Sequence, residues 1–193
     1  HNSEYVADHW KSREWISGFT GSAGTAVVTL DHAALWTDSR YFIAAAEQLA
    51  GTEYRLMKLR VEGTPTVCEW LADELAAYEK PVVGLDGNVN SFAEVAALTQ
   101  ELATRGNIRV RTDADPMATL WTARPAIPGH KVCLHPLKYA VETTASKISR
   151  IRKSLAVRGA DGLLVTALDE IAWVLNLRGS DVHCNPVFVS YLL

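Results

Sequence analysis

The sequence predicts an α/β fold in two consecutive parts, each built from strands that alternate with amphipathic helices. Three observations support this prediction. Two apolar runs, at residues 25–30 and 34–37, flank Asp31 and His32 as the strands of a hairpin would. After them, short apolar runs alternate with segments of helical periodicity. Residues 123–129 then contain two prolines and a glycine, the strongest boundary signal in the chain.

The elements of the first part follow from periodicity and from residues that begin or end a helix. Apolar or alternating runs predict strands at residues 25–30, 34–37, 54–61, 82–85 and 108–111. Apolar stripes predict helices at residues 41–50, 65–75, 92–106 and 115–122. Thr64 suits an N-cap with Pro65 at the first helical position, and Ser91 with Glu94 forms a capping box. Gly106 suits the end of the helix that Ser91 begins.

The second part is shorter and shows the same alternation. We expect an extended segment at residues 130–134, strands at 163–168 and 186–193, and a helix capped by Asp169. A basic helix, closed by Gly159, is expected to turn some side chains inward, namely Ile148, Ile151 and Leu155, and others toward solvent, namely Lys147, Arg150, Arg152 and Lys153. The predicted domains are residues 1–128 and 129–193. A second part of about 60 residues buries little apolar surface, so we expect it to be a piece of a longer protein.

Charge and cysteine content exclude several classes of protein. Lys and Arg number 19 and Asp and Glu 22, which gives a net charge of −3 and a pI near 6.1. The chain therefore lacks the basic surface that nucleic acid requires. No apolar run approaches the ~18 residues of a membrane span, and residues 1–10 contain no apolar segment of a signal peptide. Three well-separated cysteines, Cys68, Cys133 and Cys184, favour reduced thiols in a cytoplasmic protein.

A glycine-rich motif resembles a dinucleotide-binding loop, but the spacing of its glycines differs from that of such a loop. Gly18, Gly21 and Gly24 form GxxGxxG and precede a strand, whereas a dinucleotide-binding loop is GxGxxG and follows one. A tight turn with positive φ or close backbone approach is the favoured interpretation. Ser22 lacks the preceding glycine that the nucleophile elbow of a hydrolase requires, because Thr20 occupies that position.

Two segments with histidine and cysteine are weak candidates for a metal site. On a strand, Cys133 and His135 share one face and His130 points to the other, so too few ligands converge to hold zinc. His183 and Cys184 likewise supply only two possible zinc ligands. A metal site made only of residues of this chain is therefore not expected.

The polar segment at residues 37–41, Thr-Asp-Ser-Arg-Tyr, is the most informative in the chain. It lies where a strand passes into a helix, and ligands bind at the carboxyl ends of strands in α/β sheets. Asp38 or Ser39 suits the N-cap, but Arg40 in the first turn opposes the helix dipole by roughly 0.3–1 kcal/mol. The guanidinium of Arg40 is therefore predicted either to bind the carboxylate or carbonyl of a ligand, or to form an ion pair with Asp38 or another acid.

Three long segments carry a resemblance to a known family. They are SEYVADHWKSREWISGFTGSAGTAVVT at residues 3–29, LWTDSRYF at 35–42 and VTALDEIAWVLNLRGSDVHCNPVFVSY at 165–191. Their order and spacing, together with TARP at 122–125, resemble aminopeptidase P, the Xaa-Pro aminopeptidases of the creatinase/prolidase group. The resemblance covers nearly the whole chain.

This resemblance implies a fold and a function. The fold is α/β of the creatinase N-terminal (ribonuclease H-like) type, with a mixed sheet flanked by helices. The first domain would lack its opening strand and helix, and a truncated second domain of the same type would follow. The implied enzyme releases the N-terminal residue of peptides with proline at the second position, binds two manganese ions and forms a dimer. Its catalytic residues and metal ligands would lie in a C-terminal pita-bread domain outside this chain, so neither set is expected here.

The resemblance assigns one residue of this chain to substrate. Arg40 matches an arginine of the N-terminal domain that reaches the peptide-binding cleft in similar enzymes. Asp181 and Asn185 lie in a family-like loop at residues 178–186, where a structural turn is the favoured interpretation and no role is assigned to either side chain.

Other functions stay open at this point. The chain could be a non-catalytic binding module with a creatinase-like fold, or the N-terminal part of a prolidase-like dipeptidase or of creatinase. The strings GFTGSAGTA and WTDSRYF, at residues 18–26 and 36–42, resemble the last two less. A reading frame that continues into an Asp, Asp, His, Glu, Glu set would favour the aminopeptidase over the binding module.

Overall fold

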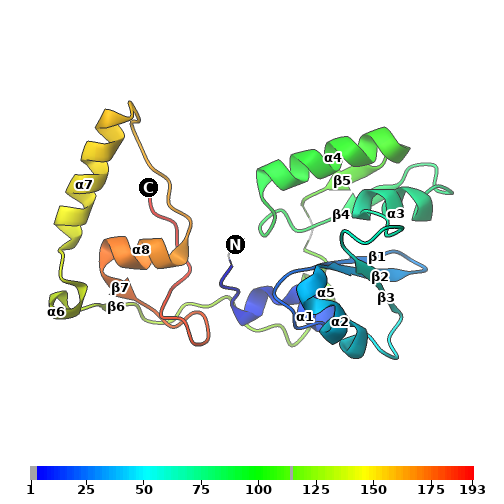
Figure 1. The fold of residues 1–193 in the computed structure, drawn as a ribbon, viewed down its shortest axis with the longest axis horizontal. Helices are drawn as coiled ribbons and strands as arrows, with labels where there is room; N and C mark the ends of the chain where they lie inside the picture. Colours follow the sequence, from blue (N-terminus) through cyan, green and yellow to red (C-terminus); the bar gives the residue numbers. More distant parts are fainter. Residues whose placement is uncertain (1–3, 114) are drawn as a thin grey trace. The chain divides into compact units, whose positions relative to one another are not determined.

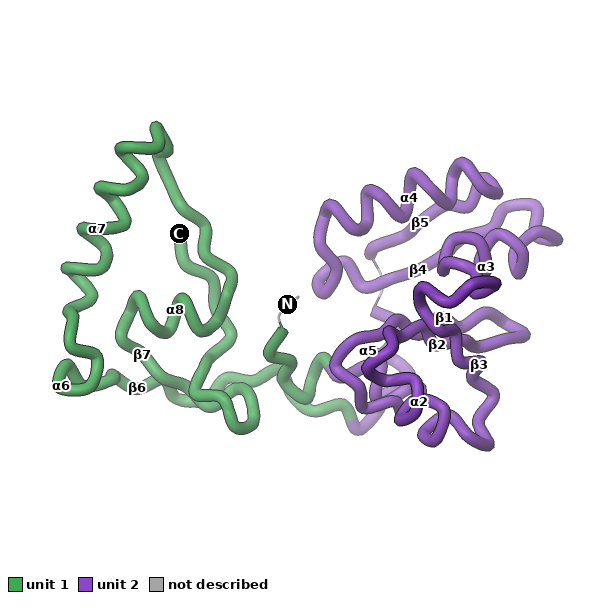
Figure 2. Tube along the Cα trace, viewed as in Figure 1, with its two compact units in different colours: residues 1–10, 124–193 green, residues 11–123 purple. Residues whose placement is uncertain are grey.

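The structure is a computed structural model that describes residues 4–113 and 115–193. Its internal contacts divide the chain into two compact units, shown in different colours in Figure 2. We call residues 11–123 the central unit, and residues 4–10 together with 124–193 the terminal unit. Each unit is described by itself.

A three-stranded mixed sheet is the frame of the central unit (Figure 1). Its strands are β1 (Thr25–Val28), β2 (Ala33–Thr37) and β3 (Tyr54–Lys58), in this order across the sheet. β1 and β2 pair antiparallel through a tight hairpin, and β2 and β3 pair parallel. A parallel pair requires a crossover, which is provided by the 3-10 turn η2 (Ser39–Tyr41) and helix α2 (Phe42–Gln48).

Strand β2 is buried on both faces because its successive side chains point to opposite sides of the sheet. Ala34 and Trp36 belong to one hydrophobic cluster, which also contains Cys68, Trp70, Leu71, Leu102 and Ile108. Leu35 belongs to a second cluster with Phe19, Ala45 and Leu49. The indole Nε1 of Trp36 donates to the carbonyl oxygen of Pro65 at 2.8 Å, so its one polar atom is satisfied.

A second, two-stranded sheet pairs β4 (Val82–Gly84) with β5 (Arg109–Arg111) in parallel. Helix α4 (Phe92–Gly106) connects these strands and packs against helix α3 (Val67–Glu74). The predicted capping box of Ser91 and Glu94 is confirmed at the start of α4. The short helices α1 (Ser12–Ser17) and α5 (Met117–Leu120) also belong to this unit.

The terminal unit is mostly helical. Its elements are η1 (Asp8–Trp10), β6 (Cys133–Leu134), α6 (Leu137–Ala140), α7 (Thr144–Val157), α8 (Leu168–Leu175) and β7 (Leu177–Arg178). β6 and β7 pair antiparallel, and α7 packs against α8. The core of this unit contains Val165, Ile171, Ala172 and Phe188. Residues 4–10 join it through His9, whose carbonyl oxygen accepts a hydrogen bond from Arg124 Nε at 2.8 Å.

The structure corrects the prediction that Lys147 faces solvent. Its side chain lies between α7 and α8, and the residue is 2% exposed. Its Nζ donates to the carbonyl oxygen of Trp173 and to Oδ1 of Asn176, each at 2.7 Å, and lies 4.2 Å from the centre of the Trp173 ring. Because these acceptors lie at the C-terminal end of α8, the cation also interacts favourably with the negative end of the helix dipole.

Two predicted helix caps were wrong by a few residues. The N-cap of α3 is Thr66 instead of Thr64, because Glu69 lies three residues after Thr66 and completes a capping box with it. Helix α8 starts at Leu168 with Ala167 as N-cap, so Asp169 lies in the first turn, where its charge favours the helix dipole.

Two predicted strands of the second part were also wrong. Residues 163–168 and 186–193 meet only at one isolated bridge, between Val165 and Leu192. Leu163 and Leu164 are exposed, so their apolar character does not lead to a buried strand in the described residues. The mixed sheet with flanking helices in the central unit nevertheless confirms the predicted α/β fold class. No helix among the described residues is long and apolar enough to cross a membrane.

Candidate functional site

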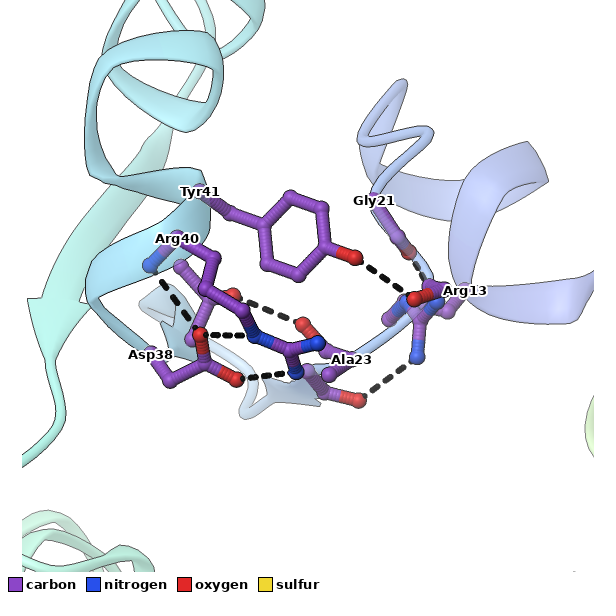
Figure 3. A network of polar contacts seen from close by, with 9 residues as sticks. Arg13, Gly21, Ala23, Asp38, Arg40 and Tyr41 are labelled. Atoms are coloured by element: carbon purple, nitrogen blue, oxygen red, sulfur yellow. Dashed lines mark hydrogen bonds and ion pairs between the residues drawn. The ribbon is translucent and has the colours of Figure 1, made fainter. Parts of the chain in front are cut away.

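The candidate site lies where strand β2 ends and the crossover to β3 begins (Figure 3). Thr37, the last residue of β2, is fully buried, and its Oγ1 donates to the carbonyl oxygen of Ala23 at 2.7 Å. Asp38 follows as the N-cap of η2, and its Oδ1 accepts a hydrogen bond from the backbone amide of Arg40 at 3.1 Å. The predicted capping role of Asp38 is therefore confirmed.

Arg40 and Asp38 form a bidentate ion pair. Arg40 Nε donates to Asp38 Oδ1 at 2.9 Å, and Arg40 Nη2 donates to Asp38 Oδ2 at 2.8 Å. These hydrogen bonds are the main cause that lowers the pKa of Asp38 and raises that of Arg40. The side chain of Arg40 is still 66% exposed. Of the two predicted roles, the structure therefore contains the ion pair, and about two thirds of the Arg40 side chain stays exposed beside it.

The glycine-rich loop at residues 18–24 packs next to this pair. Gly18 has a φ of +73°, and a Cβ on Gly24 would lie 2.8 Å from the carbonyl oxygen of Trp36. The predicted tight turn with positive φ and close backbone approach is thus confirmed. Arg13 of α1 donates to the carbonyl oxygens of Gly21 and Gly24. Since these oxygens face a cation, the loop does not have the ring of amide donors that would bind a phosphate.

Ser22 and Tyr41 connect the loop to the crossover. Ser22 Oγ and Tyr41 Oη are 2.6 Å apart, and the Tyr41 ring lies 5.1 Å from the guanidinium carbon of Arg40. Ser22 is therefore bonded to a phenol instead of a histidine, which agrees with the rejection of a serine nucleophile. Tyr41 belongs to the polar segment that the sequence pointed to, although no role was predicted for it. Arg13 was missed, because a partly buried arginine is recognisable only from the backbone oxygens that surround it.

Asp181 stabilises the loop after β7 through hydrogen bonds to the backbone. Its carboxylate is 5% exposed and accepts hydrogen bonds from the backbone amides of His130, at 3.1 Å, and Val189, at 2.9 Å. Asn185 takes part in the turn through its backbone, with its amide bonded to the carbonyl oxygen of Val182. The loop therefore contains the predicted turn, held by the Asp181 carboxylate and by the backbone of Asn185.

The described residues do not fit a metal centre. Among residues 4–113 and 115–193, no three side chains of His, Cys, Asp or Glu gather closely enough to hold an ion. His130 is bonded to Asp181, and Cys133 Sγ contacts the carbonyl oxygen of Arg178. A dinuclear centre would therefore need ligands other than the described residues of this chain.

Comparison with known proteins defines the class to which this fold and site belong. Residues 5–117 and residues 123–193 match two different families, which are both described as the Creatinase/Prolidase N-terminal domain. The first match covers more than half of the chain. The chain therefore belongs to the creatinase/prolidase N-terminal domain family, as the resemblance of its motifs implied.

Two similar proteins are named as aminopeptidases. The chain is 45% identical over 192 residues to a probable Xaa-Pro aminopeptidase P of Aspergillus flavus, covering 99% of this chain and 29% of the relative. It is 43% identical over 195 residues to aminopeptidase P2 of Arabidopsis thaliana, covering 100% of this chain and 27% of the relative. The chain thus spans less than a third of the length of these two relatives.

A solved structure agrees with these relatives. X-prolyl aminopeptidase from Caenorhabditis elegans, described as a cytosolic enzyme with a di-nuclear active site, superposes with a TM-score of 0.85 at 35% identity. The superposition covers 98% of this chain and 31% of that enzyme. The similarity therefore extends over both units and corresponds to a limited part of the complete enzyme.

Proposed function

We propose that this chain is the N-terminal, non-catalytic part of an Xaa-Pro aminopeptidase, which releases the N-terminal residue of peptides with proline at the second position. The observation that carries the proposal is the identity of 43–45% along essentially the whole chain to Xaa-Pro aminopeptidases. An Xaa-Pro bond is a tertiary amide without an N–H, so most peptide-binding sites accommodate it poorly. A dedicated enzyme whose cleft is shaped by additional domains suits such a substrate.

The chemistry would take place outside this chain. We propose that the complete protein binds two manganese ions in a C-terminal pita-bread domain, is cytoplasmic, forms a dimer and does not bind nucleic acid or membranes. The description of the Caenorhabditis elegans enzyme as cytosolic and di-nuclear supports the compartment and the number of ions. The lack of a donor set among the described residues supports a metal site elsewhere. The domain division at residues 128 and 129 also stays a proposal.

Arg40 is the proposed substrate contact of this chain. It lies at the carboxyl end of β2, where ligands bind in α/β sheets, and two thirds of its side chain is exposed. Asp38 and the Tyr41 ring hold the guanidinium in place. An arginine that is already oriented loses little conformational freedom on binding a peptide, so its hydrogen bonds stabilise the complex more effectively.

The test uses the complete protein that contains this chain. With manganese present, it is expected to release the first residue of an Xaa-Pro-Xaa peptide, while the isolated chain is expected to be inactive. Arg40→Ala should lower kcat/KM at least about tenfold, since a charged hydrogen bond contributes roughly 1.5–3 kcal/mol. Arg111→Ala is the matched control, because Arg111 forms the same kind of pair with Asp113 at the end of β5.

Three outcomes would contradict parts of this proposal. Unchanged kcat/KM in the Arg40 variant would remove Arg40 from the substrate site. Cleavage restricted to dipeptides would favour a prolidase-like enzyme. A complete protein that cleaves no Xaa-Pro peptide would contradict the aminopeptidase assignment.

A further inference from the structure

Asp38 leaves only one part of the Arg40 guanidinium available to a ligand. The carboxylate of Asp38 binds Nε and Nη2 at 2.9 and 2.8 Å. Among the described residues, Nη1 has no hydrogen-bond partner. A ligand that meets Arg40 therefore meets Nη1 and the remaining N–H of Nη2, because Asp38 already occupies the Nε and Nη2 edge of the guanidinium.

The orientation of this pair is fixed by the local backbone. Asp38 is the N-cap of η2 and accepts the Arg40 amide at 3.1 Å with the same Oδ1 that binds Nε. The Tyr41 ring lies 5.1 Å from the guanidinium carbon, and Tyr41 Oη is bonded to Ser22 Oγ. Asp38 thus holds the head of Arg40 from one side, and the ring of Tyr41 limits its movement further.

The pair also has no net charge. The carboxylate of a ligand at Nη1 would lie roughly 6–7 Å from the Asp38 carboxylate, with one guanidinium between them. Repulsion between the two anions would offset much of the attraction to Arg40. The oxygen of a backbone carbonyl has no net charge and accepts the same hydrogen bond without this repulsion.

We propose that Asp38 is a positioning residue that makes the Arg40 site select an uncharged backbone carbonyl over a carboxylate. The proposal rests on the proposed function and refines it. The preferred substrates are peptides whose chain continues past the carbonyl that Arg40 contacts, and peptides whose C-terminal carboxylate falls at this position are accepted less well.

The experiment compares two substrates that differ only in this charge. The complete enzyme is assayed on a series of Xaa-Pro peptides of increasing length, each as free acid and as C-terminal amide, and kcat/KM is measured for both forms. Asp38→Asn keeps an oxygen that can cap η2 and bind Nε, but removes the negative charge. At the length where the wild-type enzyme most favours the amide, Asp38→Asn is expected to raise the ratio of acid to amide about three- to tenfold. Raising the salt concentration should reduce this change.

Asp113→Asn is the matched control. Asp113 forms the same bidentate pair with Arg111, two residues away, at 3.0 and 2.8 Å, and it lies at the other sheet of the central unit. This variant should leave the ratio of acid to amide unchanged. Thermal denaturation of both variants shows whether either substitution affects folding.

The outcomes separate this inference from the proposed function. If the wild-type enzyme cleaves Xaa-Pro peptides but Asp38→Asn changes both forms equally or neither of them, the role of Asp38 is contradicted and the aminopeptidase assignment stands. A shift of similar size in Asp113→Asn would likewise overturn the role of Asp38. If the wild-type enzyme cleaves neither form at any length, both proposals fall.

Discussion

Replacing Gly21 by alanine is expected to destabilise the central unit by about 1–3 kcal/mol. A Cβ at this position would lie 2.1 Å from Cζ of Phe19 and less than 3 Å from both Cε atoms of that ring. Non-bonded carbon atoms normally approach to about 3.5–4.0 Å. The Phe19 ring is fully buried against Leu35, Ala45 and Leu49, so it cannot turn aside into solvent. Adding atoms to a packed core of this kind usually costs roughly 1–3 kcal/mol.

Thermal or chemical denaturation measures this effect. For a domain of about 100 residues, each kcal/mol lowers Tm by roughly 4–8 °C, so the shift is well outside the error of the method. Gly84→Ala is the control, because a Cβ there meets nothing within 4 Å and its φ is not positive. The control is expected to be neutral or slightly stabilising, since alanine restricts the unfolded chain.

The reasoning about close packing in the glycine-rich loop would be refuted if Gly21→Ala and Gly84→Ala had the same Tm. In that case the loop would have room for a side chain, and the contacts between Gly21 and Arg13 would not depend on the absence of a Cβ. If Gly21→Ala displaces the loop, the hydrogen bond between Ser22 and Tyr41 is expected to weaken as well, because Ser22 directly follows Gly21.

Three further predictions concern other parts of the molecule. Lys147→Met should destabilise the terminal unit by about 2–4 kcal/mol in a denaturation experiment, because one buried and one partly buried oxygen lose their donor. Lys153→Met, on the exposed face of α7, should change stability by less than about 0.5 kcal/mol. Two hydrogen bonds lower the pKa of Glu142 from 4.5 to about 2, and the bond from Arg150 has a larger effect than the bond from Ser146. Its contribution to stability is therefore present above pH 4.5 and lost as the pH falls toward 2, and Glu142→Gln should flatten this part of the stability profile. Burial raises the pKa of the Cys68 thiol to about 11, so a thiol reagent at neutral pH should label the two exposed cysteines of the native protein and reach Cys68 only on unfolding.

The strands and helices of the central unit were largely predictable because local rules and tertiary packing agree there. The runs that predicted the hairpin became β1 and β2, and the capping box at Ser91 starts α4 as expected. Local rules favour Thr64 over Thr66 as the cap of α3, because Pro65 suits a first helical position. The capping box with Glu69 outweighs this preference, since it satisfies two backbone donors at once.

Prediction failed where a segment depends on neighbours far away in the sequence. Residues 163–168 are as apolar as a buried strand, but a strand also needs a partner along its length, and only Val165 has one among the described residues. Lys147 has the sequence signature of a solvent-facing residue on a basic helix. Its burial depends on the carbonyl oxygen of Trp173 and the side chain of Asn176, which lie 26 and 29 residues further along the chain.

The sequence by itself determined the fold class, the family through its long motifs, and the position of Arg40 at the end of a strand, because these depend on short-range patterns and on the order of residues. Only the tertiary structure decided what surrounds Arg40. The pairing with Asp38, the Tyr41 ring beside it and the loop held by Arg13 depend on where side chains and backbone oxygens lie in space. Hydrogen bonds act over about 3 Å, so a pattern of residue types can suggest which groups could bind but cannot choose among them.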